Sequence, residues 1–294
     1  MKVLFVMHNN NKFSGANLAM QEVIDKLSPD IEYAVLYPER GGSADSYFLE
    51  KGVETLYANY WPSLLSETDG KLKNILKYLL LGIRKMEMEM SCLKMAKDIR
   101  QFDLIYSNTS AVCFGLMLSK KYGIPHIWHI REFLDADHRF IFPFGKKAYY
   151  KTADNINGEI IAISECLSKA VSPYFIHKNI NLIYDDVDAV YVNPTNFSLE
   201  VHDLKILIAG DIKKGKGQYE AIKAINILKQ KGINAELYIA GKIGDSAYFS
   251  TMKEFVNTNK LNNSVFFLGV VKDMNKLRSK MNIGIVASIS EAFG

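Results

Sequence analysis

Two turns of this chain carry residue types that could bind a charged ligand. Lys216 lies in the glycine-rich turn 210–217, and Glu291 lies in the stretch 287–294. Each turn follows a short apolar run typical of a buried β-strand, and ligands of open α/β sheets bind at the carboxyl ends of the strands. We therefore expect Lys216 and Glu291 to face one crevice. A cation beside a carboxylate suits a ligand with both phosphate and hydroxyl groups, such as a nucleotide sugar.

A second candidate site combines an imidazole with a guanidinium. The apolar run 126–130 predicts a strand that leads directly into Arg131 and Glu132. Because side chains alternate along a strand, His129 and Arg131 point to the same side, at an edge where ligands bind. The alternative is a packed histidine without a catalytic role, which is the commoner use of a single histidine on a strand.

A third candidate is the turn that contains Gly15 and Ala16. It follows the strand expected over 2–8 and opens an amphipathic helix, a unit that can place an anion at a helix N-terminus. The G-x-G-x-x-G spacing of a dinucleotide site is absent from the sequence. A plain turn in which Ser14 caps the helix is the alternative.

Strand-like and helix-like stretches alternate in both halves of the chain, which predicts parallel sheets with right-handed crossovers. The 294 residues suffice for two cores, and we place the boundary at Asp185, giving domains 1–184 and 185–294. The expected strands are 2–8, 31–37, 55–58, 102–106, 126–130, 159–163, 181–184, 204–209, 235–240, 265–268 and 283–287.

With these features in place, the chain resembles retaining glycosyltransferases of the group 1 type, glycosyltransferase family 4, which includes sucrose synthase and bacterial glycan mannosyltransferases. The family signature begins with Glu, any residue, Phe and Gly, and Glu291, Phe293 and Gly294 match it. A second signature glutamate would follow the sequence given. The resemblance implies an α/β fold of the GT-B type, with two Rossmann-like domains facing a cleft and the second domain incomplete. We expect a chain that stops there to be a poor catalyst.

The resemblance also assigns the glycine-rich turn to the donor diphosphate. Lys216 matches the family's diphosphate-binding lysine, whereas Asp211 stands where an arginine is common. Lys213 or Lys214 would then supply the second positive charge. The resemblance implies that Glu291 binds a hydroxyl group of the donor sugar.

The resemblance also implies that the first domain binds the acceptor and the second domain binds the donor. The implied reaction transfers a sugar from a UDP- or GDP-linked donor to a glycan or lipid-linked acceptor, with retention and without a metal, in bacterial surface polysaccharide synthesis. Two alternatives are a non-catalytic nucleotide-sugar-binding protein and another GT-B enzyme, such as a sugar-nucleotide epimerase. The residues implied in the sugar and acceptor pocket are His129 and Arg131, and those added to the donor site are Gly15, Ala16, Phe293 and Gly294.

The helix predicted over 71–101 concentrates the positive charge of the chain. It carries eight Lys and Arg and three acidic residues, a net charge of +5, whereas the whole chain carries +4. Apolar residues from Leu72 to Leu93 recur at helical spacing, so this helix could lie on an anionic membrane surface. A helix whose apolar stripe faces the core is the alternative.

Composition indicates a cytoplasmic enzyme that acts in solution or at the inner face of a membrane, and not on nucleic acid. The three cysteines, Cys92, Cys113 and Cys166, lack metal-ligand spacing and are expected to be reduced thiols. The amino-terminal apolar run 3–7 is too short for a signal peptide, and no apolar run approaches the ~20 residues of a spanning helix.

Overall fold

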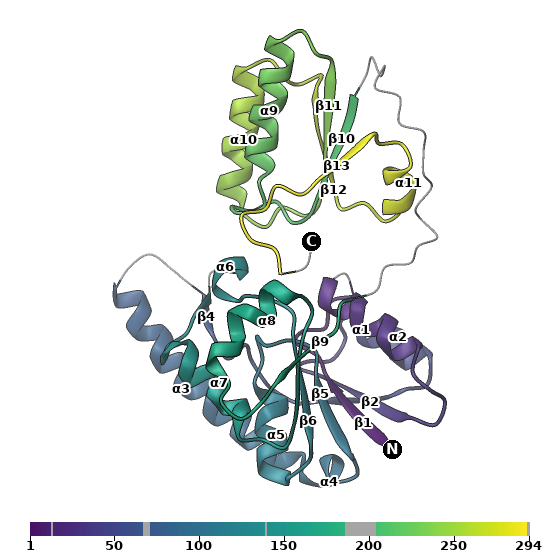
Figure 1. Ribbon diagram of the computed structural model, residues 1–294, viewed down its shortest axis with the longest axis vertical. Coiled ribbons are helices and arrows are strands. Elements are labelled where there is room, and N and C mark those ends of the chain that lie inside the picture. Colours follow the sequence, from purple (N-terminus) through teal and green to yellow (C-terminus); the bar gives the residue numbers. More distant parts are fainter. Residues whose placement is uncertain (13, 67–70, 139, 186–203, 293–294) are drawn as a thin grey trace. The chain divides into compact units, whose positions relative to one another are not determined.

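Two sheets of parallel strands, one in each half of the chain, organise the structure (Figure 1). The computed structural model describes residues 1–12, 14–66, 71–138, 140–185 and 204–292. The chain divides into two compact units, unit 1 within Met1–Asp185 and unit 2 within Asp186–Ala292. This is the α/β architecture that the alternating pattern predicts.

Unit 1 is built on a seven-stranded sheet in the order β3-β2-β1-β5-β6-β8-β9. The strand order reverses between β1 and β5, and such a switch point is where open α/β sheets bind ligands. The strands are β1 (Lys2–Val6), β2 (Glu32–Tyr37), β3 (Glu54–Tyr57), β5 (Leu104–Ser107), β6 (His126–Ile130), β8 (Gly158–Ala162) and β9 (Ile180–Leu182).

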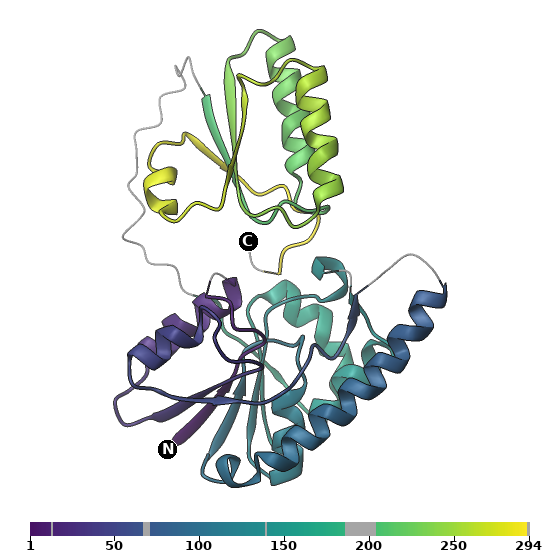
Figure 2. The same cartoon turned by 180° about the vertical axis from the view of Figure 1, so that it is seen from behind.

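Eight α-helices and one 3-10 turn connect the described strands of unit 1 (Figure 2). A short antiparallel pair, β4 (Leu65–Ser66) with β7 (Phe140–Ile141), lies apart from the main sheet. The helices are α1 (Gly15–Asp25), α2 (Asp45–Glu50), α3 (Lys71–Lys94), α4 (Ala96–Ile99), α5 (Phe114–Tyr122), α6 (Asp135–His138), α7 (Gly145–Asp154), α8 (Glu165–Val171) and the 3-10 turn η1 (Ser172–Tyr174).

The central strand β1 shows why this sheet is covered on both faces. Leu4 and Val6 pack in one core with residues of α3, α4 and α5, whereas Val3 and Phe5 pack in another core with residues of α1 and α2. A strand buried on both faces reads as a continuous apolar run, because both sets of alternating side chains must leave water.

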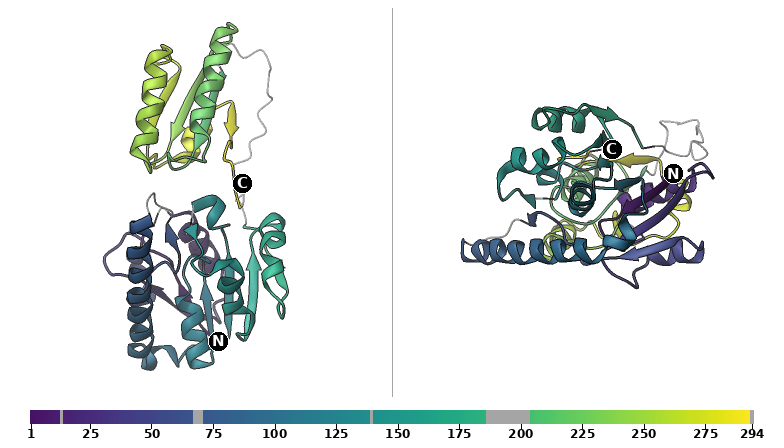
Figure 3. Two further views of the ribbon diagram at one scale, coloured as in Figure 1. Left: turned by 90° about the vertical axis from the view of Figure 1, so that its left-hand side faces the viewer. Right: turned by 90° about the horizontal axis from the view of Figure 1, so that it is seen from below.

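Helix α3 corrects one expectation from the sequence. The structure buries Met88 and Cys92, so the core-facing side of α3 is not the regular apolar stripe. The left view of Figure 3 shows α3 on an outer side of unit 1. The stripe residues, each more than half exposed, are Leu76, Leu79, Ile83, Met86, Met90 and Leu93, which we call the outer stripe. The alternative of a core-facing stripe is therefore wrong for these residues.

Unit 2 is built on a smaller sheet of four parallel strands, in the order β12-β11-β10-β13. Its strand order reverses between β10 and β13, which pair directly. Figure 1 shows α9 and α10 side by side on one face of the sheet. The elements are β10 (Leu204–Ala209), α9 (Gln218–Gln230), β11 (Ala235–Ala240), α10 (Ser246–Thr258), β12 (Val265–Gly269), α11 (Met274–Arg278) and β13 (Ile283–Ile285).

Candidate functional site

Lys216 and Glu291 form an ion pair in unit 2, with 2.6 Å between Lys216 Nζ and Glu291 Oε1. Lys216 lies in the turn between β10 and α9, and Glu291 follows β13, so the pair lies at the carboxyl ends of the two strands at the switch point. Both side chains are partly exposed. The structure thus brings together the two residues that the sequence placed in one crevice.

Gly217 lets the turn approach the segment that carries Glu291. Its φ is 75°, in the left-handed region, and a Cβ built on it would lie 2.1 Å from the carbonyl oxygen of Ala287. A second link is the hydrogen bond from the Ile289 N–H to the Gly215 carbonyl, 2.8 Å long. Only glycine combines this backbone angle with this close contact.

Gly217→Ala is expected to destabilise unit 2 by about 2 kcal/mol more than Gly232→Ala does, because a displaced contact adds to the left-handed strain of roughly 1–2 kcal/mol that both share. Gly232 is the matched control, since its φ is also 75° but its Cβ position has no neighbour within 4 Å among the residues that the structure describes. Urea unfolding of the two variants measures the difference. Equal destabilisation would show that the turn can move away from Ala287 at no cost.

The other residues expected in the donor site differ in what they contact. Asp211 forms an ion pair with Lys242 at 3.5 Å, so this acidic replacement of the expected arginine already has a cationic partner. Lys213 and Lys214 follow in the same turn, and Lys214 is exposed. The remaining two expected donor residues, Phe293 and Gly294, lie outside the described residues.

In unit 1, Arg131 is the centre of a buried polar network. Its Nε donates to Asn108 Oδ1 (3.0 Å), its Nη1 pairs with Asp185 Oδ2 (2.5 Å), and its Nη2 lies 3.3 Å from His129 Nδ1. Asn108 in turn donates to the carbonyl of Ala16 at the start of α1 (2.7 Å). The network therefore joins the ends of β5 and β6, the segment after β9 and the α1 turn, including three of the residues expected from sequence.

His129 is held as a neutral imidazole with one unused hydrogen-bond donor. Burial first, and then the Arg131 charge, lower its pKa to about 2. Tyr106 Oη lies 2.7 Å from Nδ1, and burial raises the pKa of Tyr106 to about 12, so this phenol keeps its proton. Since the guanidinium of Arg131 can only donate, Nδ1 accepts and the proton resides on Nε2. That Nε2 is buried without a hydrogen-bond partner among the described residues.

The stability of unit 1 should fall in mild acid. Burial is the main cause of the pKa values of about 3 for His126 and about 2 for His129, both below the ordinary 6.5. The unfolded chain thus takes up protons that the folded one cannot, so the stabilisation is complete above pH 6.5 and is lost as the pH falls below it. Each of the two histidines should lower the free energy of unfolding by about 1 kcal/mol between pH 7 and pH 5.5.

Denaturant unfolding at the two pH values, followed by tryptophan fluorescence, measures this loss, because Trp61 and Trp128 both lie in unit 1. His129→Phe should about halve the pH dependence, whereas His177→Asn, which removes an exposed histidine, should leave it unchanged. An unchanged pH dependence in His129→Phe would contradict the buried neutral state.

Glu132 has a structural role that the sequence did not reveal. It is buried, and its Oε1 accepts hydrogen bonds from the backbone N–H groups of Ser110 (2.9 Å) and Ala111 (3.1 Å) and from the hydroxyl of Thr109. Burial raises the pKa of Glu132, and these hydrogen bonds oppose the shift. Thr109 and Ser110 do not cap a helix, because α5 begins only at Phe114.

At the α1 turn, Ser14 does not cap the helix through its side chain, and its Oγ instead lies 3.2 Å from His8 Nε2. Gly15 is exposed, and no atom of the described residues lies within 4 Å of its Cβ position. By contrast, Ser164 does cap α8, accepting from the N–H of Leu167 at 3.2 Å. The described residues therefore leave the space beside Gly15 open.

The residues that sequence reasoning missed are Tyr106, Asn108 and Asp185. Asn108 was visible as part of a polar run after a strand, the position where open sheets bind ligands. The sequence indicated Asp185 only as the domain boundary, and no local pattern pairs it with Arg131. Among the described residues, no cluster of three or more His, Cys, Asp or Glu is placed to hold a metal ion.

Two parallel-stranded α/β units with polar residues at their switch points define a protein that resembles the GT-B glycosyltransferases. Residues 195–294 match the family model described as "Glycosyl transferases group 1". No curated protein sequence matches the chain significantly. Within the described part of the chain, no helix has both the length and the apolar character needed to cross a membrane.

Solved glycosyltransferase structures share this fold over the whole chain. Anabaena Alr3699/HepE, in complex with UDP and glucose, is 18% identical with a TM-score of 0.75, covering 100% of this chain and 76% of that one. The lipopolysaccharide outer core galactosyltransferase WaaB is 16% identical with a TM-score of 0.65, with coverage of 100% and 76%. An S. aureus TarM variant in complex with Fondaparinux, α-GlcNAc-glycerol and UDP is 11% identical with a TM-score of 0.68, with coverage of 100% and 82%.

Proposed function

We propose that this chain transfers a sugar from a nucleotide-sugar donor to a glycan or lipid-linked acceptor, with retention of the anomeric configuration, in bacterial surface polysaccharide synthesis. The observation that carries the proposal is the Lys216–Glu291 pair, 2.6 Å apart at the switch point of unit 2, within the residues that match the group 1 family model. A cation and a carboxylate at that position provide for a diphosphate and for a sugar hydroxyl, respectively.

Structures of similar fold support the choice of ligands. HepE is described in complex with UDP-glucose, and the TarM variant with UDP and an α-GlcNAc-glycerol. We therefore propose a UDP-linked sugar as the first donor to test, with GDP-linked sugars as the second. WaaB acts on the lipopolysaccharide outer core, which is consistent with an acceptor of the cell surface.

In the proposed reaction, Lys216 neutralises the diphosphate as the bond to the sugar breaks, without a metal ion. The N-terminus of α9 begins next to this lysine, and its aligned N–H groups favour an anion there. Stabilising charge where it develops in the transition state is often the largest catalytic contribution. Glu291 would bind a donor-sugar hydroxyl once the phosphate takes over the contact with Lys216.

Unit 1 would supply the sugar and acceptor pocket. The Nε2–H of His129 is a buried donor without a partner among the described residues, so a hydroxyl of the sugar or acceptor could accept from it. Arg131 contacts the imidazole directly through Nη2, and it is linked to the α1 turn through Asn108. Gly15 leaves space for the donor diphosphate at the start of α1.

A donor screen followed by a transfer assay tests the function. A nucleotide sugar at ~100 times its dissociation constant should stabilise the protein by ~2.7 kcal/mol, which thermal unfolding detects. The stabilising donor is then incubated with cell-envelope glycolipids, and mass spectrometry and NMR identify the product and its anomer. Binding without transfer or hydrolysis would favour a non-catalytic binding protein, and an isomerised nucleotide sugar would favour an epimerase.

We also propose that the enzyme is cytoplasmic and works at the inner face of a membrane, with the outer stripe of α3 against the lipid. Six apolar side chains are exposed on this stripe, and the segment 71–100 carries a net charge of +5. An amphipathic helix with this combination binds an interface through its apolar face and attracts anionic headgroups through its cations.

Vesicle binding should rise with the fraction of anionic lipid and fall with salt, since each Lys or Arg near such a surface contributes ~1 kcal/mol. The double variant Ile83→Glu with Met86→Glu should bind at least about tenfold more weakly, because two apolar contacts are lost and two negative charges added. Vesicle sedimentation provides the measurement.

Leu49→Glu is the matched control, because Leu49 is also a half-exposed apolar residue of unit 1 but lies on α2. Its binding should equal that of the unmodified protein. Equal binding by all variants, or equal binding to neutral and anionic vesicles, would exclude the outer stripe as the membrane contact.

A further inference from the structure

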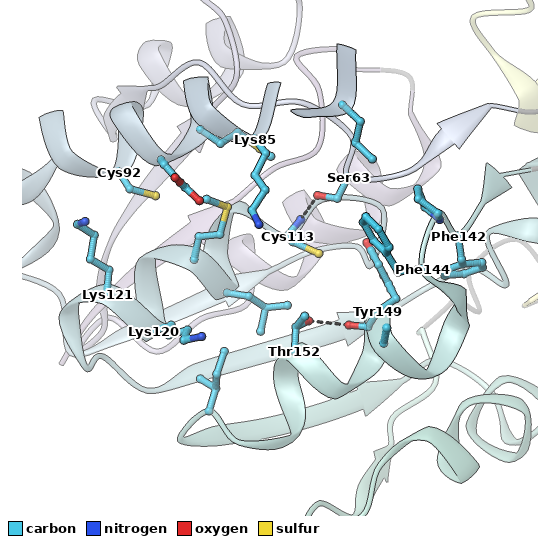
Figure 4. A pocket seen from close by; sticks show the side chains of 18 of the residues that line it. Ser63, Lys85, Cys92, Cys113, Lys120, Lys121, Phe142, Phe144, Tyr149 and Thr152 are labelled. Atoms are coloured by element: carbon cyan, nitrogen blue, oxygen red, sulfur yellow. Dashed lines mark hydrogen bonds between the residues drawn. The ribbon is translucent and has the colours of Figure 1, made fainter. Parts of the chain in front are cut away.

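A large pocket in unit 1 lies between α3, α5, α7 and the aromatic segment before α7 (Figure 4). Its volume is about 700 Å³, within the range of about 300–1,000 Å³ in which proteins bury most of a small ligand. It belongs neither to the polar network around Arg131 nor to the Lys216–Glu291 pair. The proposed transfer reaction therefore does not use it.

The interior of the pocket is apolar. Met88, Cys92 and Leu116 are buried in its wall, and Phe142 and Tyr149 add aromatic surface. Burial raises the pKa of the Cys92 thiol to about 12 and also raises that of Cys113, so both sulfurs stay neutral. Figure 4 shows both sulfur atoms directed toward the cavity. Such a lining favours a hydrocarbon chain over a polar ligand.

The rim of the pocket is cationic. Lys85 of α3 and Lys120 and Lys121 at the end of α5 are exposed and line it, and Glu89 is the one acidic residue of the described lining. None of these four side chains forms an ion pair or hydrogen bond with another described residue. Three ammonium groups without a partner among the described residues, placed around an apolar cavity, match a ligand that is anionic at one end and apolar along its length.

We propose that this pocket binds a phosphate-headed lipid, with one hydrocarbon chain inside the cavity and the phosphate at Lys85, Lys120 and Lys121. A free phosphate would leave the apolar interior unused, and an uncharged amphiphile would leave the three cations unpaired. Phe144, which is 81% exposed at the rim, adds an apolar contact for the part of the chain nearest the head. The site lies on the inner side of α3, opposite the outer stripe.

The cysteines of this chain provide a direct test. Cys113 lines the pocket, whereas Cys166 on α8 is exposed and lies outside it. N-ethylmaleimide labelling of each cysteine is followed over hours by peptide mass spectrometry, because burial raises the pKa of the Cys113 thiol and slows its reaction. Dodecyl phosphate is kept below its micelle-forming concentration. Bound dodecyl phosphate should slow the labelling of Cys113 at least about fivefold and leave that of Cys166 unchanged, because only one of the two thiols is covered.

Two controls separate the parts of the ligand. Inorganic phosphate carries the charged head without the chain, and dodecyl maltoside carries the chain on an uncharged head. Neither compound should protect Cys113 at the concentration at which dodecyl phosphate does. Protection by inorganic phosphate would identify a plain anion site, and equal protection by dodecyl maltoside would remove the role of the lysines. Absent or equal protection of both cysteines by dodecyl phosphate would overturn the proposal.

Variants locate the site on the structure. Lys120→Glu with Lys121→Glu should weaken dodecyl phosphate binding at least about tenfold, because two attractive charges become repulsive. The matched control is Lys97→Glu with Lys151→Glu, two exposed lysines outside the lining. Ala148→Trp, at an exposed position of the lining, should block the cavity without disturbing the core. Equal affinity in all three variants would exclude this pocket.

Discussion

Arg131→Met is expected to lower the free energy of unfolding of unit 1 by about 3 kcal/mol, because removing one partner of a buried ion pair leaves the other uncompensated. The guanidinium is the shared partner of Asn108, His129 and Asp185. Asn108 is fully buried, so its carbonyl oxygen would lose its hydrogen bond without gaining water. The Asp185 side chain is partly exposed, at 24%, and would recover some hydration. The expected loss therefore lies at the lower end of the ~3–5 kcal/mol that removing one partner of a buried ion pair costs.

Denaturant unfolding followed by tryptophan fluorescence measures this effect in unit 1. Lys146→Met is the matched control, since Lys146 pairs with Asp135 at 2.7 Å but both side chains are 38% exposed. An exposed pair of this kind should contribute no more than about 1 kcal/mol. Arg131→Lys should fall between the two, because an ammonium keeps the charge but cannot reach all three partners. If Arg131→Met lowered the free energy of unfolding no more than Lys146→Met does, the contacts of Arg131 with its three partners would not stabilise unit 1 beyond an exposed ion pair.

Lys216→Ala should weaken UDP binding by about 10–100-fold, the loss expected for a hydrogen bond to a charged group worth about 1.5–3 kcal/mol. Lys216 is partly exposed, so the substitution should leave unit 2 folded. Glu291→Gln should instead strengthen the binding of UDP alone, because it removes a carboxylate that competes with the phosphate for Lys216. The same variant should weaken the binding of the UDP-sugar, if Glu291 contacts the sugar.

Titration calorimetry with UDP and with the stabilising UDP-sugar measures both effects. Lys231→Ala, an exposed lysine at the other end of α9, is the control and should bind both as the unmodified protein does. UDP affinity that is unchanged in Lys216→Ala would remove this residue from the diphosphate site. That result would leave the lipid pocket of unit 1 untouched, because the two sites share no residue.

The sequence by itself determined the alternation of strands and helices and where ligand-binding side chains could lie. Lys216 and Glu291 were placed together because each follows a parallel strand, and such strands end at the same edge of a sheet. The two-residue period of a strand placed His129 and Arg131 side by side, and Arg131 Nη2 lies 3.3 Å from His129 Nδ1. Ser164 caps α8 from the position just before the helix, where a serine side chain can accept from a free backbone N–H. The pairing of His129 with Arg131 and the cap by Ser164 depend on local geometry, whereas the pairing of Lys216 with Glu291 depends on the common direction of parallel strands.

Tertiary structure decided what local geometry leaves open. A helical period shows that one face of α3 is apolar but not which face the rest of unit 1 covers, and the structure buries Met88 and Cys92 while it exposes the outer stripe. Asp185 reaches Arg131 across 54 residues of sequence, so no spacing rule could have paired them. The pocket is formed by α3, α5 and α7, whose separate sequences give no sign of a shared cavity. Packing between distant segments, and not local propensity, therefore fixes the outward face of α3 and the polar network of unit 1.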